Sequence, residues 1–357
     1  MLKSFGTRNF RCLEDFELHD LARVNLIVGD NDTGKTVLLE ALFGHLAQAN
    51  ALKFVTLKAF RQTTTSPDET FWQEFFTGFD DSKEIDLWSV DSRGNERRSK
   101  IAVGQDTQIP FASPPASGAL VETPGKPGVQ PGLFRPLRVE YKDGTMEEPS
   151  LNEVVFDPSK GVFAQTHKSS PDLRGYYFST AGPPGAESVA HHLSELIVNK
   201  QQSFLIEFAK VIDERILNLT VASPKGISEV FVDLGEAQLH RLSLLGSGVV
   251  RALGIASAIP AYTGGVLLVD EIETGIYYKR LADFWKNIYE IAKRFDVQLI
   301  ATTHSAECTR FAIETVTADL QDADPLHIYR LVRGKRSPIP YEGENLRSAL
   351  EFGAEVR

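Results

Sequence analysis

The sequence contains few cysteines, no long apolar run and no excess of basic residues. Cys12 and Cys308 are the only cysteines among 357 residues, too few for a disulfide framework, so we expect a reduced, cytoplasmic protein. Apolar stretches such as residues 265–269 are far shorter than the roughly 20 residues that span a bilayer. The first residues also lack the apolar core of a signal peptide, and we therefore expect no membrane association.

The net charge of -10 argues against a protein that coats nucleic acid, because such binding depends on neutralising phosphates. Four cations, Arg93, Arg97, Arg98 and Lys100, lie close together in the sequence. We interpret them as part of a solvated β-hairpin; a local basic patch is the alternative.

Three short segments rich in Val, Ile and Leu are predicted to be buried parallel strands: residues 24–28, 266–269 and 297–302. Apolar residues recur at helical spacing across residues 276–295, so a helix should connect the last two strands. A strand, a helix and a strand in that order imply a right-handed crossover and an α/β fold with a mostly parallel core sheet.

Other segments predict antiparallel and helical additions to this sheet. Residues 3–19 and 84–103 alternate as hairpins do, and a further hairpin is expected around Asp143-Gly144. Helical spacing returns over residues 185–216. Residues 110–136 contain seven of the 18 prolines, a density that excludes a paired strand and favours a surface loop.

Residues 29–36 fit the phosphate-binding pattern G-x-x-x-x-G-K-[ST] and lie between the first predicted strand and a helical run. Glycines let backbone N–H groups wrap phosphates, and the start of the helix adds its positive end. Lys35 should reach the β- and γ-phosphates and Thr36 should ligate Mg²⁺, so we predict ATP and Mg²⁺ as ligands. The predicted nucleotide-binding residues of this phosphate loop are Gly29, Asp30, Asn31, Asp32, Thr33, Gly34, Lys35 and Thr36.

The second and third predicted strands end in residues that suit phosphate hydrolysis. Asp270 would hold Mg²⁺, and Glu271 would act as general base towards the attacking water. His304 follows the third strand and would hydrogen-bond the γ-phosphate or that water. Because ligands of open α/β sheets sit at the carboxyl ends of strands, we expect these residues beside the phosphate loop. Lys35, Glu271 and His304 are thus the predicted catalytic residues.

Several motifs resemble a known family of ATPases. Residues 9–13 followed by 24–29 are similar to the opening of SMC-, RecF- and OLD-type ATPases, where OLD stands for overcoming lysogenization defect. Residues 270–277 (DEIETGIY) resemble the Walker B motif and D-loop of the OLD group, and residues 302–305 (TTHS) resemble its switch-histidine segment. Residues 242–248 (LSLLGSG) resemble a degenerate ABC signature.

This resemblance covers residues 1–60 and 240–357 well and 185–240 loosely, and it implies an ABC-type P-loop head that hydrolyses ATP. It also implies that two heads dimerise head to tail, with the signature of one copy capping the γ-phosphate in the other. Small residues at the start of a helix suit an anion. The residues that would act in trans are Ser243, Gly246, Ser247 and Gly248. The family's Q-loop glutamine has no distinctive motif here, and Gln62 and Gln73 stay open as candidates.

Many OLD proteins also carry a C-terminal Toprim nuclease, and a domain of this kind needs about 100 residues or more. Only 53 residues follow His304 in the 357-residue chain. Asp319, Asp322 and Asp324 are spaced like metal ligands, but no apolar strand precedes them. We interpret these acids as a solvated loop and expect no nuclease in this chain.

The predicted organisation has four parts. Residues 1–60 and 240–320 would form the ATPase core, residues 61–184 a β-rich lobe, and residues 185–239 a helical lobe with a short β segment. Residues 321–357 would add a hairpin that turns near Gly334-Lys335 and a short helix after Pro340.

The resemblance implies an ATP-dependent homodimer or higher homo-oligomer that regulates a separately encoded effector, a nuclease or toxin, in bacterial anti-phage defence. The alternative is a RecF-like DNA-repair ATPase, so nucleic acid stays open as a partner. A third hypothesis is an interaction protein with a vestigial nucleotide site, but the intact Lys35, Thr36, Asp270 and Glu271 argue against it.

Overall fold

The structure, a computed structural model, divides into two compact units. The first unit contains Asp20–Leu39 and Arg174–Arg357 together with Met1, and the second contains Leu2–His19 and Glu40–Leu173. The residues that the structure describes are 1–61, 70–104, 135–157, 161–166, 175–180, 186–317 and 326–341.

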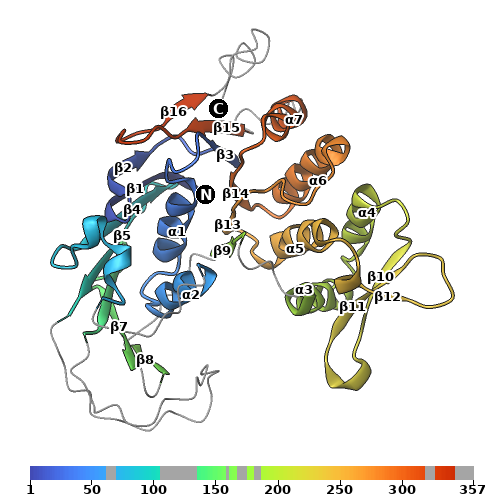
Figure 1. Ribbon diagram of the computed structural model, residues 1–357, viewed down its shortest axis with the longest axis horizontal. Coiled ribbons are helices and arrows are strands. Elements are labelled where there is room, and N and C mark those ends of the chain that lie inside the picture. Colours follow the sequence, from blue (N-terminus) through green and yellow to red (C-terminus); the bar gives the residue numbers. More distant parts are fainter. Residues whose placement is uncertain are drawn as a thin grey trace. The chain divides into compact units, whose positions relative to one another are not determined.

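The first unit is built on a six-stranded sheet that is parallel except at one edge. In spatial order its strands are β16 (Ile339–Tyr341), β15 (Leu326–Arg330), β3 (Val24–Val28), β14 (Gln298–Thr302), β13 (Val266–Val269) and β9 (Gly175–Phe178). Only β16 is antiparallel to its neighbour. Because β3, β14 and β13 are adjacent and parallel, their carboxyl ends meet at one edge of the sheet (Figure 1).

Helices and a small second sheet complete the first unit. The helices are α3 (Ala186–Val198), α4 (Ser203–Ile212), α5 (Ser247–Ala261), α6 (Leu281–Arg294) and α7 (Ala306–Val316), with the start of α1 (Lys35–Leu46). The small antiparallel sheet contains β10 (Asn218–Ala222), β11 (Glu229–Asp233) and β12 (His240–Arg241).

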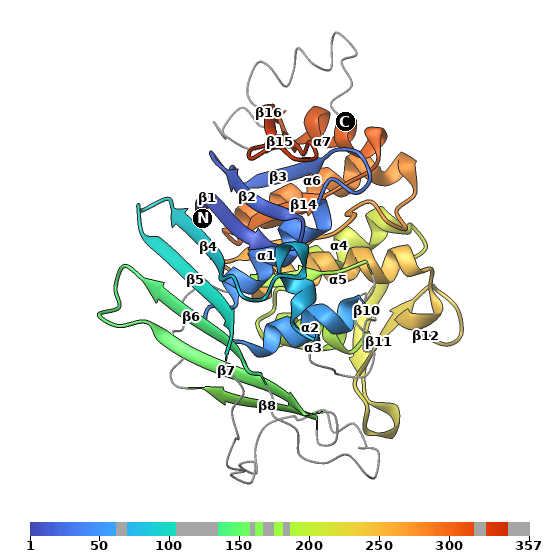
Figure 2. The same ribbon diagram turned by 60° about the vertical axis from the view of Figure 1, so that its left-hand side comes forward.

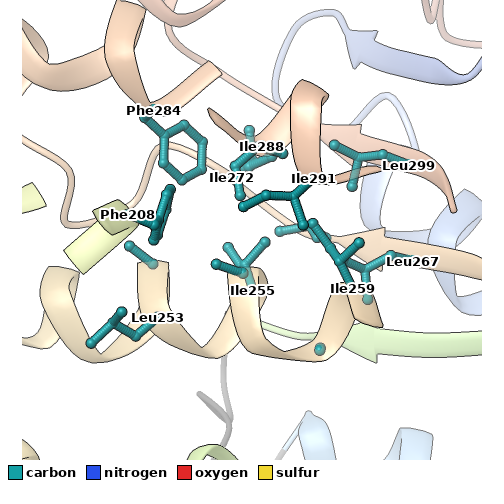
Figure 3. Close-up of a cluster of buried hydrophobic side chains, with 14 of the residues drawn as sticks. Phe208, Leu253, Ile255, Ile259, Leu267, Ile272, Phe284, Ile288, Ile291 and Leu299 are labelled. Atoms are coloured by element: carbon teal, nitrogen blue, oxygen red, sulfur yellow. The ribbon is translucent and has the colours of Figure 1, made fainter. Parts of the chain in front are cut away.

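A continuous apolar core holds α5 and α6 on the parallel sheet (Figure 3). Ile255 and Ile259 of α5 and Ile288 of α6 are completely buried, as are Leu267 of β13 and Leu299 of β14. Burying one such side chain is worth about 1.5–3 kcal/mol, so this cluster fixes the helices that flank the strand ends.

The fold class expected from the sequence is confirmed. The strands β13 and β14 are parallel and joined through α6, as the predicted crossover requires. The helix begins at Leu281 rather than at residue 276. A turn ends at Gly275, which has a φ of 81°, and a 3-10 helix, Tyr278–Arg280, precedes α6. The helical run predicted at 185–216 is two helices, α3 and α4.

The second unit is a seven-stranded antiparallel sheet with helix α2 (Leu52–Phe60) and the end of α1 (Figure 2). The three predicted hairpins are confirmed by direct pairing of β1 with β2, β4 with β5 and β6 with β7. In spatial order the strands are β2 (Leu13–Leu18), β1 (Leu2–Phe10), β4 (Ile85–Asp91), β5 (Glu96–Val103), β6 (Leu137–Asp143), β7 (Ser150–Asp157) and β8 (Gly161–Thr166).

The boundaries of the two units differ from the division expected from the sequence. Residues 2–19 and 40–60, expected in the ATPase core, belong to the second unit, because β1 hydrogen-bonds to β4 of the antiparallel sheet. The helical segment 185–239 lies in the same compact unit as the parallel sheet.

The C-terminal hairpin is present as β15 and β16, with Pro340 inside β16. Three further expectations fall outside the described residues, either wholly or for the most part. They are the proline-rich loop 110–136, the acids Asp319, Asp322 and Asp324, and the helix after Pro340.

The basic cluster of the second unit is largely paired with acids. Arg97 contacts Asp91 at 2.9 Å and Lys100 contacts Glu84 at 3.0 Å. Arg98 forms a two-pronged contact with Asp86. Three of the four cations therefore have a neighbouring carboxylate, which agrees with a solvated hairpin.

His45 of α1 is buried between two strands of the second unit. Its Nδ1 contacts Ser99 Oγ and its Nε2 contacts Ser89 Oγ, both at 2.8 Å, and the residue is 2% exposed. Burial, aided by the nearby charge of Arg97, lowers the pKa of His45 from 6.5 to about 3. The neutral ring can donate to one serine and accept from the other, whereas a protonated ring cannot accept.

We expect this histidine to make the protein less stable in mild acid. Between pH 6.5 and pH 3 the unfolded chain binds more protons than the folded one, so stability falls as the pH is lowered through this window. From pH 7.5 to pH 5.5 the loss due to His45 should be about 1 kcal/mol. Denaturant unfolding at both pH values should show a smaller loss in His45→Gln than in the wild type. His191→Gln, a change at an exposed histidine, should behave as the wild type; equal losses in all three would contradict this origin.

Candidate functional site

The phosphate loop follows β3 and leads directly into α1. Gly29 has a φ of 139°, and a Cβ there would lie 2.6 Å from the carbonyl oxygen of Leu331. Gly34, just before the helix, has a φ of 96°. Only glycine fits these two positions without strain, so the loop keeps its backbone open for close approach of an anion.

Lys35 folds back over its own loop. Its ammonium donates to the carbonyl oxygens of Gly29 at 2.7 Å and Asp30 at 2.8 Å. Burial lowers the pKa of Lys35, and the negative charges of Asp270 and Asp30 oppose that shift. A phosphate entering the loop would offer this cation a stronger, charged acceptor than the two carbonyls.

The carboxylate of Asp270, at the end of β13, accepts hydrogen bonds from threonine hydroxyl groups of three other segments. Thr36 Oγ1 lies 3.1 Å from both carboxylate oxygens, Thr302 Oγ1 donates at 2.7 Å, and Thr180 Oγ1 lies at 3.4 Å. Asp270 is 3% exposed. The contact between Thr36 and Asp270 joins the phosphate loop to the acidic strand end, as the sequence motifs predicted.

This pair of oxygen donors fits a magnesium ion. Neighbouring ligands of an octahedral ion with bonds of about 2.1 Å lie about 3 Å apart, close to the 3.1 Å between Thr36 Oγ1 and Asp270. Mg²⁺ usually takes only one or two protein ligands and fills its shell with water and substrate phosphates. Within the described ranges, no group of three or more His, Cys, Asp or Glu residues could form a metal cage.

Glu271 has an uncommon backbone conformation with a φ of 48°. Its N–H donates to Thr302 Oγ1 at 2.8 Å, and that hydroxyl in turn donates to Asp270. Its carboxylate accepts from Thr274 Oγ1 at 3.1 Å. The side chain is partly exposed, with one carboxylate oxygen 3.9 Å from His304 Nε2. The two acids thus diverge: Asp270 faces inward towards Thr36, while Glu271 faces solvent and His304.

His304 follows β14 and borders a pocket beside the phosphate loop. Its backbone N–H donates to Glu273 Oε1 at 3.0 Å, and its ring remains accessible. The pocket has a volume of about 210 Å³. Its lining residues are Val28, Gly29, Asp30, Asn31, Thr303, His304, Ser305 and Thr309.

The structure brings together Lys35, Thr36, Asp270, Glu271 and His304, all within the first unit. Within the phosphate loop, Thr33 Oγ1 donates a hydrogen bond to the carbonyl oxygen of Asp30. Asp32 lies on the outside, where its carboxylate is 3.5 Å from Arg333 and highly exposed.

The signature-like segment, residues 242–248, has no hydrogen bond to the phosphate loop of its own chain in the described structure. Ser243, Gly246 and Ser247 are exposed, and α5 begins at Ser247 without a side-chain cap or an acid in its first turn. Gly248 is buried, and a Cβ there would lie 1.7 Å from the carbonyl oxygen of Gly275. Gly248 therefore has a packing reason to be glycine, whatever its ligand contacts. Of the two Q-loop candidates, Gln62 lies outside the described residues and Gln73 lies in the second unit.

Four residues in the site were not predicted from the sequence. Thr302 links Asp270 to Glu271, Thr180 reaches Asp270, and Glu273 holds the backbone of His304. Arg251 of α5 contacts the backbone of both acids. A single cation within the apolar run of α5 was a recognisable sign of a buried polar contact. The threonines and Glu273 carry no comparable sign.

Two protein-family models match parts of the chain. Residues 1–113 match the family described as AAA ATPase domain. Residues 148–308 match an AAA-domain family whose description names the AbiEii toxin and a Type IV TA system. Together the two matches include the phosphate loop, the acidic pair and His304.

Two curated proteins are similar along nearly the whole chain. An ATP/GTP phosphatase of Helicobacter pylori (strain ATCC 700392 / 26695) is 21% identical, covering 98% of both chains. An OLD nuclease of Thermus scotoductus (strain ATCC 700910 / SA-01) is 23% identical, covering 98% of this chain and 66% of the nuclease. The chain is thus similar to OLD-type ATPases along nearly its whole length. Its similarity therefore extends over about two thirds of that nuclease.

Solved structures of SMC heads also align with this chain. An SmcHead bound to the C-winged helix domain of ScpA aligns with a TM-score of 0.48 at 11% identity, covering 97% of this chain and 99% of that one. An Smc head domain with an extended coiled coil, bound to a ScpA domain derived from Pyrococcus furiosus, gives 0.47 at 10% identity, covering 99% of each. Within the described ranges, the chain has no helix with the length and apolar character to span a bilayer.

Proposed function

We propose that this ATPase is a dimeric switch, in which bound ATP joins two copies and hydrolysis separates them. The observation that carries the proposal is that two anion-binding features of the first unit do not contact each other through a hydrogen bond within one chain. The phosphate loop is complete with Lys35, Thr36, Asp270 and Glu271, while the start of α5 is exposed, uncapped and not bonded to that loop. A helix start of this kind attracts a phosphate, and a second copy can supply one.

Within one site, the side chains have separable tasks. Lys35 and the loop N–H groups bind the β- and γ-phosphates of ATP. Thr36 and Asp270 would hold Mg²⁺, which neutralises phosphate charge when bound. Glu271 accepts a proton from the attacking water, and Thr274 keeps its carboxylate in place. His304, 3.9 Å from Glu271, lies where it can hydrogen-bond the γ-phosphate or the water.

The same proposal assigns the OLD-like ATPase to the control of a separately encoded effector in anti-phage defence. Support comes from the relatives: one is named a nuclease, of which this chain matches 66%, and a matching family description names a toxin system. The effector would then respond to whether two ATPase copies are joined. RecF-like DNA binding has less support, because three of the four clustered cations lie beside carboxylates.

Mixing two inactive variants tests whether the signature-like segment acts in trans. Lys35→Ala should destroy nucleotide binding, and Ser247→Arg should block the start of α5 with a long side chain at an exposed position. In a mixed head-to-tail dimer, the intact loop of one copy meets the intact α5 of the other. An equal mixture should therefore recover about a quarter of wild-type ATPase activity.

The matched control mixes Lys35→Ala with Glu271→Gln. Both changes affect the same nucleotide site of a chain, so no mixed dimer contains an intact site and activity should stay at background. If the first mixture stays as inactive as the control although mixed dimers are detected with ATP, the trans arrangement is wrong.

A further inference from the structure

Arg251 is a buried cation on α5, one turn beyond the signature-like segment. The helix sequence, SGVVRALGIASAIPA, has no other charged residue, and Arg251 is 4% exposed. Taking a guanidinium out of water is costly unless charged or polar groups satisfy it. An apolar side chain would fill the same space more cheaply, so the contacts of Arg251 call for a functional explanation.

The guanidinium binds backbone carbonyls at the ends of two neighbouring strands. Its Nη1 donates to the carbonyl oxygen of Ser179, which follows β9, at 3.3 Å. Its Nη2 donates to the carbonyl oxygen of Asp270 and lies 3.4 Å from that of Glu271. Its Nε has no hydrogen-bond partner in the described part of the chain. Arg251 is thus oriented for these three carbonyls, even though one of its N–H groups stays unpaired.

These contacts complete the support of the acidic pair. Thr302 holds the N–H of Glu271, and Arg251 holds the carbonyls on either side of that N–H. Glu271 has a φ of 48°, a conformation that non-glycine residues seldom adopt without support from their surroundings. The direction of the Glu271 side chain follows from that backbone conformation.

Charge favours the same arrangement. Burial lowers the pKa of Arg251, and the carboxylates of Asp270, Glu271 and Glu273 oppose this shift. Three acids within four residues repel one another, and a fixed cation beneath them offsets part of that repulsion. Leu253 and Ile255, on the same helix, belong to the central apolar core that holds α5 in place (Figure 3).

We propose that Arg251 is a positioning residue, which sets the backbone of Asp270 and Glu271 and so directs the Glu271 carboxylate. The proposal rests on the role of Glu271 as general base. It assigns no contact between Arg251 and the nucleotide. Loss of the guanidinium should therefore slow hydrolysis and leave nucleotide binding nearly unchanged.

The first test compares Arg251→Lys with Ser257→Ala, a buried polar change on the same helix, away from the acids. Lysine keeps the charge but cannot reach three carbonyls with a planar fork. We expect kcat to fall about 10- to 100-fold in Arg251→Lys, with KM and the affinity for a non-hydrolysable ATP analogue within about threefold of wild type. Ser257→Ala should retain the wild-type kcat, even if its melting temperature falls by as much as that of Arg251→Lys.

A double variant separates positioning from general destabilisation. If Arg251 acts through Glu271, Arg251→Lys should slow the Glu271→Gln enzyme less than about twofold, because the group that it directs is already inactive. A full further loss in the double variant, or a parallel loss of analogue affinity, would overturn the proposal. If Glu271→Gln alone leaves hydrolysis at the wild-type rate, Glu271 is not the general base. That result contradicts the proposed function and is distinct from a failure of the Arg251 proposal.

Discussion

A Glu271→Gln variant should bind ATP and hydrolyse it about 10²- to 10⁴-fold more slowly than the wild type, because the amide cannot accept the proton of the attacking water. Glutamine has the same shape, and its amide oxygen can still accept from Thr274. Asp270, Thr36 and Lys35 are untouched, so the nucleotide and metal ligands should remain. Single-turnover hydrolysis and equilibrium binding of ATP, measured on the same preparation, separate the two effects.

The same variant should accumulate as a dimer when ATP is present. Slow hydrolysis keeps the γ-phosphate in place, and the γ-phosphate is what the start of α5 in a second copy would bind. Light scattering with ATP, with ADP and without nucleotide should show the dimer with ATP alone. Glu314→Gln, the same change at an exposed position of α7, is the matched control and should hydrolyse ATP normally. A strictly monomeric Glu271→Gln protein, with ATP verified as bound, would exclude the trans arrangement.

Replacing Lys35 with alanine should lower the affinity for ATP at least about 100-fold, since a hydrogen bond to a charged group is worth about 1.5–3 kcal/mol and Lys35 can make more than one to the phosphates. Its ammonium contacts the carbonyl oxygens of Gly29 and Asp30. Water can replace the ammonium there, so the fold should persist. Calorimetric titration with ATP measures the affinity directly.

The control for this change is Lys286→Ala on the exposed side of α6, which removes one positive charge from the same unit away from the loop. It should bind ATP as the wild type does, and both variants should melt within a few degrees of it. Retained ATP affinity in a folded Lys35→Ala protein would show that the phosphate loop does not bind the nucleotide in the expected way.

The candidate site residues that could be predicted are those grouped in short sequence motifs. A phosphate loop needs its glycines, lysine and threonine at set spacing, and Asp270, Glu271 and His304 lie within two residues of the end of a buried strand. Because carboxyl ends of parallel strands share one edge, local patterns alone placed these residues together, and the contact between Thr36 and Asp270 matches that expectation.

The supporting residues were not predictable in the same way. Thr302, Glu273 and Arg251 act through hydrogen bonds between segments, and such bonds depend on side-chain directions in the packed state. Gly248 looked like a ligand contact in the signature-like segment, but its close approach to Gly275 gives it a packing reason that spacing could not reveal.

Periodicity and motif spacing were sufficient to predict an α/β fold, the approach of the phosphate-loop pattern to Asp270, and the antiparallel hairpins. Three-dimensional packing decided the rest: which strands neighbour β13, how residues 2–19 and 40–60 join the antiparallel unit, and how Arg251 comes to lie beneath the acids. The reason is physical. Local propensities act between residues a few positions apart, whereas strand order and buried polar contacts join groups that are distant in the chain and meet only when the core closes.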